Sequence, residues 1–349
     1  MSDKKHIKWI SYVKILGIIL VVLGHSFHEY PDGVNGVTFW LYKFIYSFHM
    51  PLFVFVSGLV LSYSCVRKNC AEKYSKFSYS KFKQLIIPFI VLGIIVFPFR
   101  AIMSFCADDS MPLSVGAFVE SLLYSNKLSI TFFWFLPMIY ICQLVGYGVK
   151  KSKNVVIFGA LCIIAVMLHF FNYLGGLSLF SINYVGVYLI YFMIGMLCGN
   201  NILKFRNTVK WHSPYVLALT LSAWGISYYV CYNIANTDVM RFVCAMCGIS
   251  MMVSVACVIE YYNVRILDHL EGATYMIFLL SWFFNVGSQQ LLHHFTDFPW
   301  QVYSAISIVT AIYIPLYIYR YIMHNTKSRV VNILAWILGH KSNLSRRKD

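Results

Sequence analysis

The sequence predicts an all-α protein: a polytopic transmembrane helical bundle of about ten spans, with the N and C termini in the cytoplasm. Of its 349 residues, 59% are hydrophobic and only 12% are charged, whereas soluble globular proteins are roughly 45–50% apolar and about 25% charged. The apolar residues gather in windows of about twenty residues, the length that crosses a bilayer as a helix. The segments between the windows alternate in charge, which gives the orientation.

Each window is too long and too uniformly apolar to be a strand of a membrane barrel. A helix, by contrast, satisfies all its backbone hydrogen bonds within itself, as a lipid environment requires. The predicted spans are residues 9–28, 38–64, 84–106, 131–149, 155–172, 182–199, 213–233, 239–260, 272–293 and 299–323.

Basic residues are concentrated in alternate connecting segments. The termini and the even-numbered loops hold 23 of the 28 lysines and arginines. The other loops carry little basic charge and hold acidic residues such as Asp108, Asp238 and Asp297. Because positive residues are retained on the cytoplasmic side, this pattern places both termini inside. The net charge of +15 therefore follows from topology, and no nucleic-acid partner is expected.

The windows run without a break in composition, so we expect one integral-membrane domain over residues 1–325 and a basic cytoplasmic tail over 326–349. Among the outer loops, 107–130 is long and contains a stretch that could form an amphipathic interfacial helix. Most of the ten cysteines lie inside apolar windows, where a thiol is ordinary packing. We therefore expect no metal.

Two ionisable residues of the first window, Lys14 and His25, are candidates for function because such groups are costly inside a membrane. They are eleven residues apart, and steps of about 100° bring them within about 20° of each other on a helix, with a rise of about 16 Å. Lys14 would lie near the cytoplasmic mouth and His25 in the outer half of the membrane. The alternative for Lys14 is snorkelling to the headgroups, and for His25 a polar packing contact.

In the second window, His49 lies near mid-membrane, directly before Met50 and Pro51. Proline frees a backbone carbonyl one turn earlier and kinks the helix, which opens space for a ligand. Ser57 and Gly58 allow close approach of another helix. The basic and aromatic loop that follows either touches anionic lipid or binds the phosphates of an anionic cytoplasmic substrate.

Together these residues resemble the integral-membrane acyltransferase 3 family, and most closely its fucose 4-O-acetylase-like group, which modifies surface polysaccharides. The strong motif matches cover about the first 150 residues. The matching stretches are KILGIILVVLGHS at 14–26, FIYSFHMPLFVFVSGLVL at 44–61, KFKQLIIPF at 81–89 and WFLPMIYICQL at 134–144.

The resemblance implies transfer of an acetyl or other small acyl group, usually from acetyl-CoA, to a hydroxyl of a cell-surface or lipid-linked glycan. It implies a multi-pass protein of a bacterial inner or plasma membrane. His25 matches the essential histidine of the family, and Lys14 stands where the family has arginine or lysine. An acidic residue commonly precedes that basic residue by three positions, and here Ser11 takes its place, which removes the usual local partner of Lys14.

The chemistry of the residues is compatible with these expectations. The anionic nucleotide of acetyl-CoA would lie on the basic cytoplasmic face, near Lys14, Arg67, Lys68 and Lys83, with its pantetheine arm extended toward His25. A neutral imidazole at His25 can take the proton of an attacking hydroxyl. A mechanism through a covalent acyl-histidine intermediate is the alternative.

Two further residues are candidates for acceptor binding. We expect His49 to orient the acceptor or to stabilise the oxyanion. Trp134 could stack a sugar ring, although an interfacial aromatic belt also explains a tryptophan at this position.

Three other classes of function remain as alternatives. A transporter or flippase of a lipid-linked glycan would share the span number, but it should carry charged or broken helices in matching positions of two halves. A membrane glycosyltransferase would need larger outer loops than these. A non-catalytic membrane partner would leave Lys14, His25 and His49 unexplained.

Overall fold

Helices make up almost all of the chain that the computed structural model describes, namely residues 7–27, 36–104, 114–128, 130–325 and 327–340. Within these ranges the only β-structure is an isolated bridge between Tyr124 and Leu179. All ten predicted windows are helical, which confirms the all-α fold class. Parts of two predicted outer loops, and residues 341–349 of the predicted tail, lie outside the described residues.

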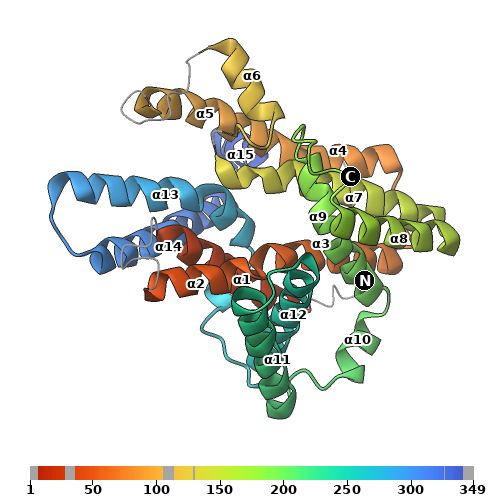
Figure 1. The fold of residues 1–349 in the computed structure, drawn as a ribbon. Helices are drawn as coiled ribbons and strands as arrows, with labels where there is room; N and C mark the ends of the chain where they lie inside the picture. Colours follow the sequence, from red (N-terminus) through yellow and green to blue (C-terminus); the bar gives the residue numbers. More distant parts are fainter. Residues whose placement is uncertain (1–6, 28–35, 105–113, 129, 326, 341–349) are drawn as a thin grey trace. The chain divides into compact units, whose positions relative to one another are not determined.

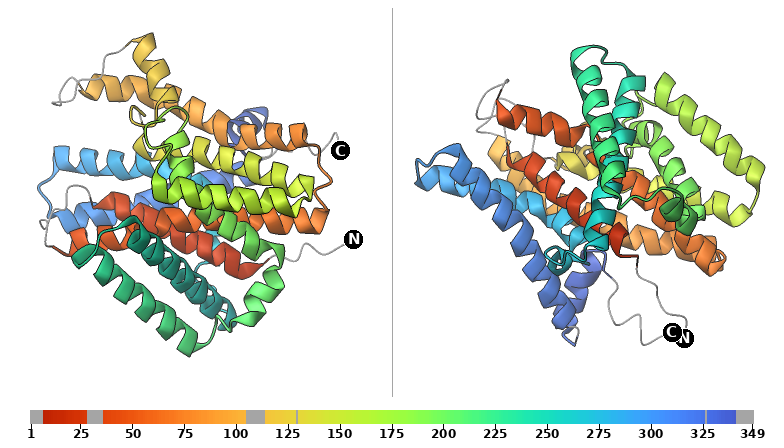
Figure 2. Two further views of the ribbon diagram at one scale, coloured as in Figure 1. Left: turned by 45° about the vertical axis from the view of Figure 1, so that its right-hand side comes forward. Right: turned by 90° about the horizontal axis from the view of Figure 1, so that it is seen from below.

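The chain divides into two compact units, the first formed by residues 1–56 and 203–325. In this unit α1 contacts α2, α12, α13 and α14, while α11 packs beside α12 and α13 beside α14 (Figures 1 and 2). Its elements are α1 (Lys8–Ser26), α2 (Val37–Tyr46), the start of α3 (His49–Lys68), α10 (Ile202–Thr208), α11 (Pro214–Asn233), α12 (Asp238–Tyr261), η3 (Asp268–Leu270), α13 (Thr274–Phe295) and α14 (Trp300–His324).

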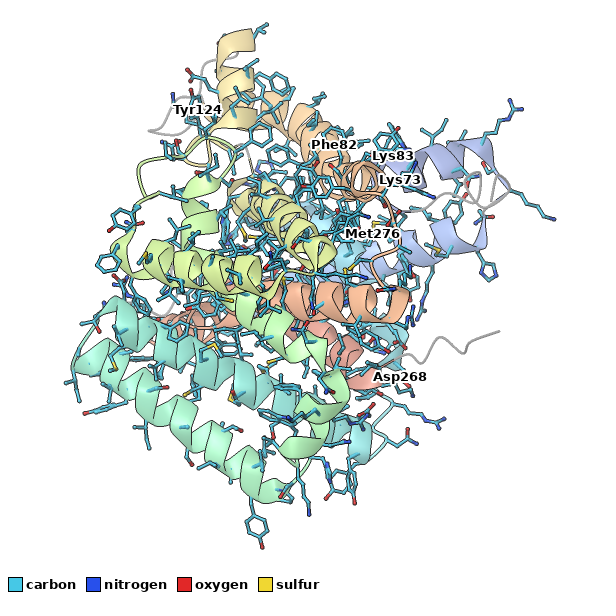
Figure 3. The ribbon with its side chains drawn as sticks, turned by 90° about the vertical axis from the view of Figure 1, so that its right-hand side faces the viewer. Lys73, Phe82, Lys83, Tyr124, Asp268 and Met276 are labelled. Atoms are coloured by element: carbon cyan, nitrogen blue, oxygen red, sulfur yellow. The ribbon has the colours of Figure 1, made fainter. Side chains whose placement is uncertain are left out.

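The second unit is formed by residues 57–202 and 326–349, so the boundary falls inside α3. Here α9 packs against α7 and α8, and Figure 3 marks the segment of α4 and η1 with Lys73, Phe82 and Lys83. Its further elements are α4 (Tyr74–Lys81), η1 (Phe82–Ile86), α5 (Ile87–Ser104), α6 (Val115–Leu123), η2 (Thr131–Trp134), α7 (Phe135–Ser152), α8 (Val155–Phe171), α9 (Ile182–Asn200) and α15 (Arg329–Ile337).

Eight helical segments of the described chain are long and apolar enough to cross a membrane. The other two predicted windows are α8, which has 17 residues, and α13, which has 22. The apolar sequence of α13 is interrupted by Asn285, Gln289 and Gln290, and this lowers its hydropathy. A spanning helix that carries such groups must satisfy them by packing against other helices.

The expected close approach at Gly58 is present. A Cβ atom built on Gly58 would collide with the backbone carbonyl of Phe192 in α9, and one built on Gly199 would collide with the carbonyl of Leu59. The α3 and α9 backbones therefore touch directly, as small residues permit in membrane bundles. Beside them, Gln143 of α7 donates a hydrogen bond of 2.9 Å to the Ser57 hydroxyl.

Gly58→Ala is expected to lower the free energy of unfolding by about 1–3 kcal/mol, because the added methyl overpacks an interface in which the opposing atoms are backbone. The measurement is the thermal midpoint of the purified protein in detergent. Gly159→Ala is the matched control, since a Cβ at Gly159 of α8 meets nothing within 4 Å and alanine favours a helix. Equal midpoints for the two variants would contradict the prediction.

Candidate functional site

Lys14 and His25 lie on one unbroken helix, α1, so the helical spacing that aligned them in the sequence applies in the structure. The two flanks of this stripe belong to different neighbours. On one side, Gly24 meets Tyr46 and Ile45 of α2. On the other side, Ser26 is bonded by α13 and α14. Because successive residues turn by about 100°, His25 projects between these two flanks.

One aromatic side chain contacts both candidate histidines. The Tyr46 ring lies 6.3 Å from the His25 ring and 4.6 Å from the His49 ring, in an edge-to-face arrangement with each. Tyr46 is itself stacked on Tyr42, with ring centroids 3.9 Å apart. Both imidazoles therefore contact the same tyrosine ring. The structure thus brings His25 and His49 into one neighbourhood, as expected for parts of one site.

The predicted span over residues 38–64 lies within one segment that is long and apolar enough to cross a membrane, Val37–Lys68, and the segment is interrupted there, so that it consists of two helices. The first ends at Tyr46 and the second begins at His49. The reason is local: Pro51 has no N–H to give to the carbonyl of Ser47, and a short turn at residues 47 and 48 interrupts the helix. The break leaves the carbonyl of Ile45 2.9 Å from Nδ1 of His49.

That contact fixes the chemistry of His49. A carbonyl oxygen only accepts, so Nδ1 must carry the proton that it donates to Ile45, and in the neutral ring Nε2 is then an acceptor. The side chain is 3% exposed, and Nε2 has no hydrogen-bond partner among the described residues. An acceptor nitrogen suits the orientation of a substrate hydroxyl. It does not suit an oxyanion, which needs a donor, so the first of the two expected roles is favoured.

Lys14 lines a cavity of about 540 Å³, a volume within the range of ligand sites. The walls come from α1, from the start of α13 and from α14. The lining residues are Ser11, Lys14, Ile15, Glu271, Gly272, Thr274 and Tyr319. Lys14 forms no hydrogen bond or ion pair with the described residues, so its ammonium is available to an anion that enters the cavity.

The segment between α12 and α13, which forms part of the cavity wall, is bonded to α1. Tyr12 donates a hydrogen bond of 2.7 Å to Asp268, and Lys8 lies 3.9 Å from the same carboxylate. Asp268 is marked in Figure 3, in the short connection between α12 and α13. From α14, Arg320 donates to the carbonyl of His269 at 3.0 Å. These contacts hold the wall on the predicted cytoplasmic end of α1.

Glu271 is a site residue that the sequence did not reveal. It lines the same cavity as Lys14 and Ser11, so an acidic group is present even though position 11 is not acidic. It lies 257 residues further along the chain than Lys14, and no local spacing connects the two. A carboxylate at the predicted cytoplasmic end of a span also reads as an ordinary loop residue.

A group of polar side chains on α13 and α14 was missed as well, although a signal for it existed. Asn285 and Gln289 are polar residues inside an apolar window, which marks a functional or packing role by default. Both bond the last turn of α1, next to His25.

The other predicted donor-binding residues belong to the second unit. Arg67 and Lys68 form the exposed last turn of α3. Lys83 lies in η1, with its Nζ 4.2 Å from the centroid of the Tyr79 ring. Their grouping with Lys14 into one donor site stays a prediction.

Trp134 is also in the second unit, at the end of η2. One face of its indole is stacked on Tyr184 of α9, with ring centroids 4.0 Å apart and planes at 23°. Tyr188, one turn further along α9, lies 5.3 Å away at the same angle. A sugar could stack only where these tyrosines leave the indole open, and the aromatic grouping also fits a membrane-interface belt.

Comparison with known proteins identifies the family. The sequence model of the acyltransferase 3 family, described as an acyltransferase domain, matches residues 7–320. No curated protein matches the chain, and no solved structure matches it. The family match extends well past the first 150 residues that carry the motifs. It includes α13, which contains Asn285 and Gln289, and Glu271, which lies just before that helix. The chain belongs to the acyltransferase 3 family and is a multi-pass membrane acyltransferase.

Proposed function

We propose that this protein transfers an acetyl or other small acyl group from cytoplasmic acyl-CoA to a hydroxyl of a cell-surface or lipid-linked glycan, at the bacterial plasma membrane. The observation that carries the proposal is the arrangement along α1. One helix presents a lysine to a cavity at its predicted cytoplasmic end and, three turns further out, a histidine that contacts the same tyrosine as a second histidine.

The donor end of this arrangement is chemically suited to acyl-CoA. A phosphate oxygen entering the cavity meets the Lys14 ammonium, which has no competing partner among the described residues, and charge-assisted bonds of this kind are the strong ones. The rise of about 16 Å from Lys14 to His25 is of the same order as an extended pantetheine arm. A nucleotide held near Lys14 can therefore place its thioester near His25.

The reaction is an acyl transfer between a thioester and an alcohol. As the hydroxyl oxygen of the acceptor forms its bond to the thioester carbonyl carbon, His25 takes the hydroxyl proton. The carbon–sulfur bond then breaks, and the proton passes to the CoA thiolate, so that free CoA and the ester are released. Nε2 of His49 accepts a hydrogen bond from a hydroxyl of the glycan substrate and so orients the glycan. A covalent acyl-His25 intermediate gives the same products by two steps.

The acceptor is a carbohydrate hydroxyl on this proposal, and the family resemblance is its support. Trp134 would contribute a stacking face. The transporter alternative is not supported by the family match, which indicates an acyltransferase.

The test is acyl transfer by the purified protein in lipid nanodiscs. Labelled acetyl-CoA is supplied together with lipid-linked saccharides extracted from the native host, and products are analysed by mass spectrometry. The proposal expects a gain of one acetyl mass on a saccharide and stoichiometric release of CoA. Neither CoA release nor acylated saccharide, with protein shown to be folded, would reject it. Acylation of a lipid or protein alone would keep the donor and reject the acceptor class.

Glu271→Gln is expected to lower the KM for acyl-CoA about two- to fivefold, because it removes a negative charge from the wall of a cavity that receives an anion. The effect should shrink as salt is raised. The measurement is the dependence of initial rate on acyl-CoA concentration at low and high ionic strength. Asp238→Asn, an exposed acidic residue at the opposite end of α12 from η3, is the control. A raised KM in Glu271→Gln would instead make Glu271 an attractive contact.

A further inference from the structure

The end of α1 is unusual for a helix inside a membrane. The helix ends at Ser26, one residue after His25. Its C-cap residue, Phe27, is not a glycine and does not adopt the left-handed conformation that often ends a helix. The last carbonyls of a helix have no partner within it, and lipid supplies none. Unless other groups bond them, this end would be costly to bury, and it is buried: Ser26 is 1% exposed.

Side chains from two other helices bond the last of these carbonyls, that of Ser26. The carbonyl of Ser26 accepts from Nε2 of Gln289 at 2.9 Å and from the hydroxyl of Ser304 at 3.2 Å. One turn earlier, the carbonyl of Val22 accepts from the Ser26 hydroxyl of the same helix at 2.8 Å and from Nδ2 of Asn285 at 3.4 Å. Asn285 also donates to the Ser26 hydroxyl at 2.8 Å. The turn that carries His25 is thus capped from outside its own helix.

The polar groups in this cluster support one another. Gln289 also lies within hydrogen-bonding distance of the Asn285 side-chain oxygen, at 3.3 Å, and of the Ser307 hydroxyl, at 3.0 Å. Ser307 in turn donates to the carbonyl of Ser304 at 2.9 Å. Asn285 is 1% exposed and Ser307 is fully buried. A buried polar network in which the members have partners holds its parts in one arrangement.

The opposite side of the same turn is held by packing. A Cβ on Gly24 would lie 3.1 Å from the Tyr46 ring and 3.4 Å from the Ile45 side chain, so these two side chains of α2 pack directly on the backbone of α1. Gly24, His25 and Ser26 point in directions about 100° apart. The contacts of Gly24 and Ser26 therefore fix both the rotation and the depth of His25.

We infer that Asn285 and Gln289 are positioning residues for His25: Gln289 bonds the carbonyl of Ser26 and Asn285 bonds the Ser26 hydroxyl and the carbonyl of Val22, and together they hold the histidine in its working orientation without touching the substrate. The inference rests on the proposed function only for its catalytic readout. The side-chain amides of α13 are the natural group for this task, because each NH₂ offers two donors to a helix end that offers only acceptors.

The test compares Gln289→Leu with Gln290→Leu. Leucine is close to glutamine in size but has no donor, and Gln290 is the adjacent, exposed residue of α13, outside the network. Gln289→Leu should lower kcat about ten- to hundredfold, as expected for a catalytic group displaced by about 1 Å, with the KM for both substrates within about twofold. Gln290→Leu should match the wild type.

A second readout does not depend on acyl transfer. Carbethoxylation of His25 by diethyl pyrocarbonate, followed residue by residue by mass spectrometry, reports the accessibility and reactivity of the ring. In Gln289→Leu the rate at His25 should change severalfold, and the rate at the exposed His294 of α13 should not. If the wild type proves inactive with acyl-CoA, the proposed function fails, and this rate still decides the positioning role.

If Gln289→Leu does not reach wild-type levels in the membrane, Ser304→Ala replaces it, because it removes the other donor to the Ser26 carbonyl. A lowered kcat together with a changed rate of His25 carbethoxylation supports the inference. An unchanged rate at His25, or a kcat equal to that of Gln290→Leu, overturns it and leaves the cluster as a contact between helices.

Discussion

Replacement of His25 by alanine is expected to abolish acyl transfer, with kcat reduced about 10²- to 10⁴-fold, the usual loss when a general base is removed. The physical reason is that an alcohol at neutral pH is a weak nucleophile until its proton is taken, and in the proposed mechanism His25 takes that proton. The measurement is the initial rate of labelled acetyl transfer at equal amounts of protein in the membrane.

His294→Ala is the matched control, because this histidine lies on α13, is exposed and packs beside Phe295. It should retain wild-type activity. Acid quenching of the wild type with labelled acetyl-CoA in the absence of acceptor distinguishes the two mechanisms, since only a covalent intermediate leaves label on His25. Near wild-type transfer by His25→Ala would remove His25 from the mechanism and leave His49 as the candidate base.

Replacement of Lys14 by alanine is expected to raise the KM for acyl-CoA tenfold or more while kcat changes little. A hydrogen bond to a charged group contributes about 1.5–3 kcal/mol, and about 1.4 kcal/mol corresponds to a factor of ten in affinity. Lys14→Arg keeps the charge with a different donor geometry, so its effect should be milder. The measurement is the rate as a function of acyl-CoA concentration, at constant acceptor.

Lys8→Ala serves as the control for a basic residue on the same helix. Lys8 is exposed and lies near Asp268, but it does not line the cavity. A surface ion pair of this kind contributes little, so its KM should stay near the wild-type value. An unchanged KM in Lys14→Ala would return that lysine to snorkelling at the cytoplasmic headgroups.

The sequence predicted the helices well because hydropathy and helical periodicity are properties of neighbouring residues. Over residues 38–64 it predicted a kink at Pro51, and the structure shows a turn at residues 47 and 48 between two helices. At this turn the His49 ring is hydrogen-bonded to the carbonyl of Ile45. That bond then decided which nitrogen of His49 can face a substrate, a question on which the sequence is silent.

The sequence by itself determined the membrane-spanning fold, the predicted orientation of both termini, and the alignment of Lys14 with His25, because each follows from composition or from spacing along one helix. Only the tertiary structure placed Glu271 in the Lys14 cavity, Tyr46 in contact with two imidazoles, and Asn285 and Gln289 on the end of α1. Glu271, Asn285 and Gln289 come from segments more than 200 residues away from α1. Their meeting depends on how the helices of the unit pack, and no local pattern encodes it.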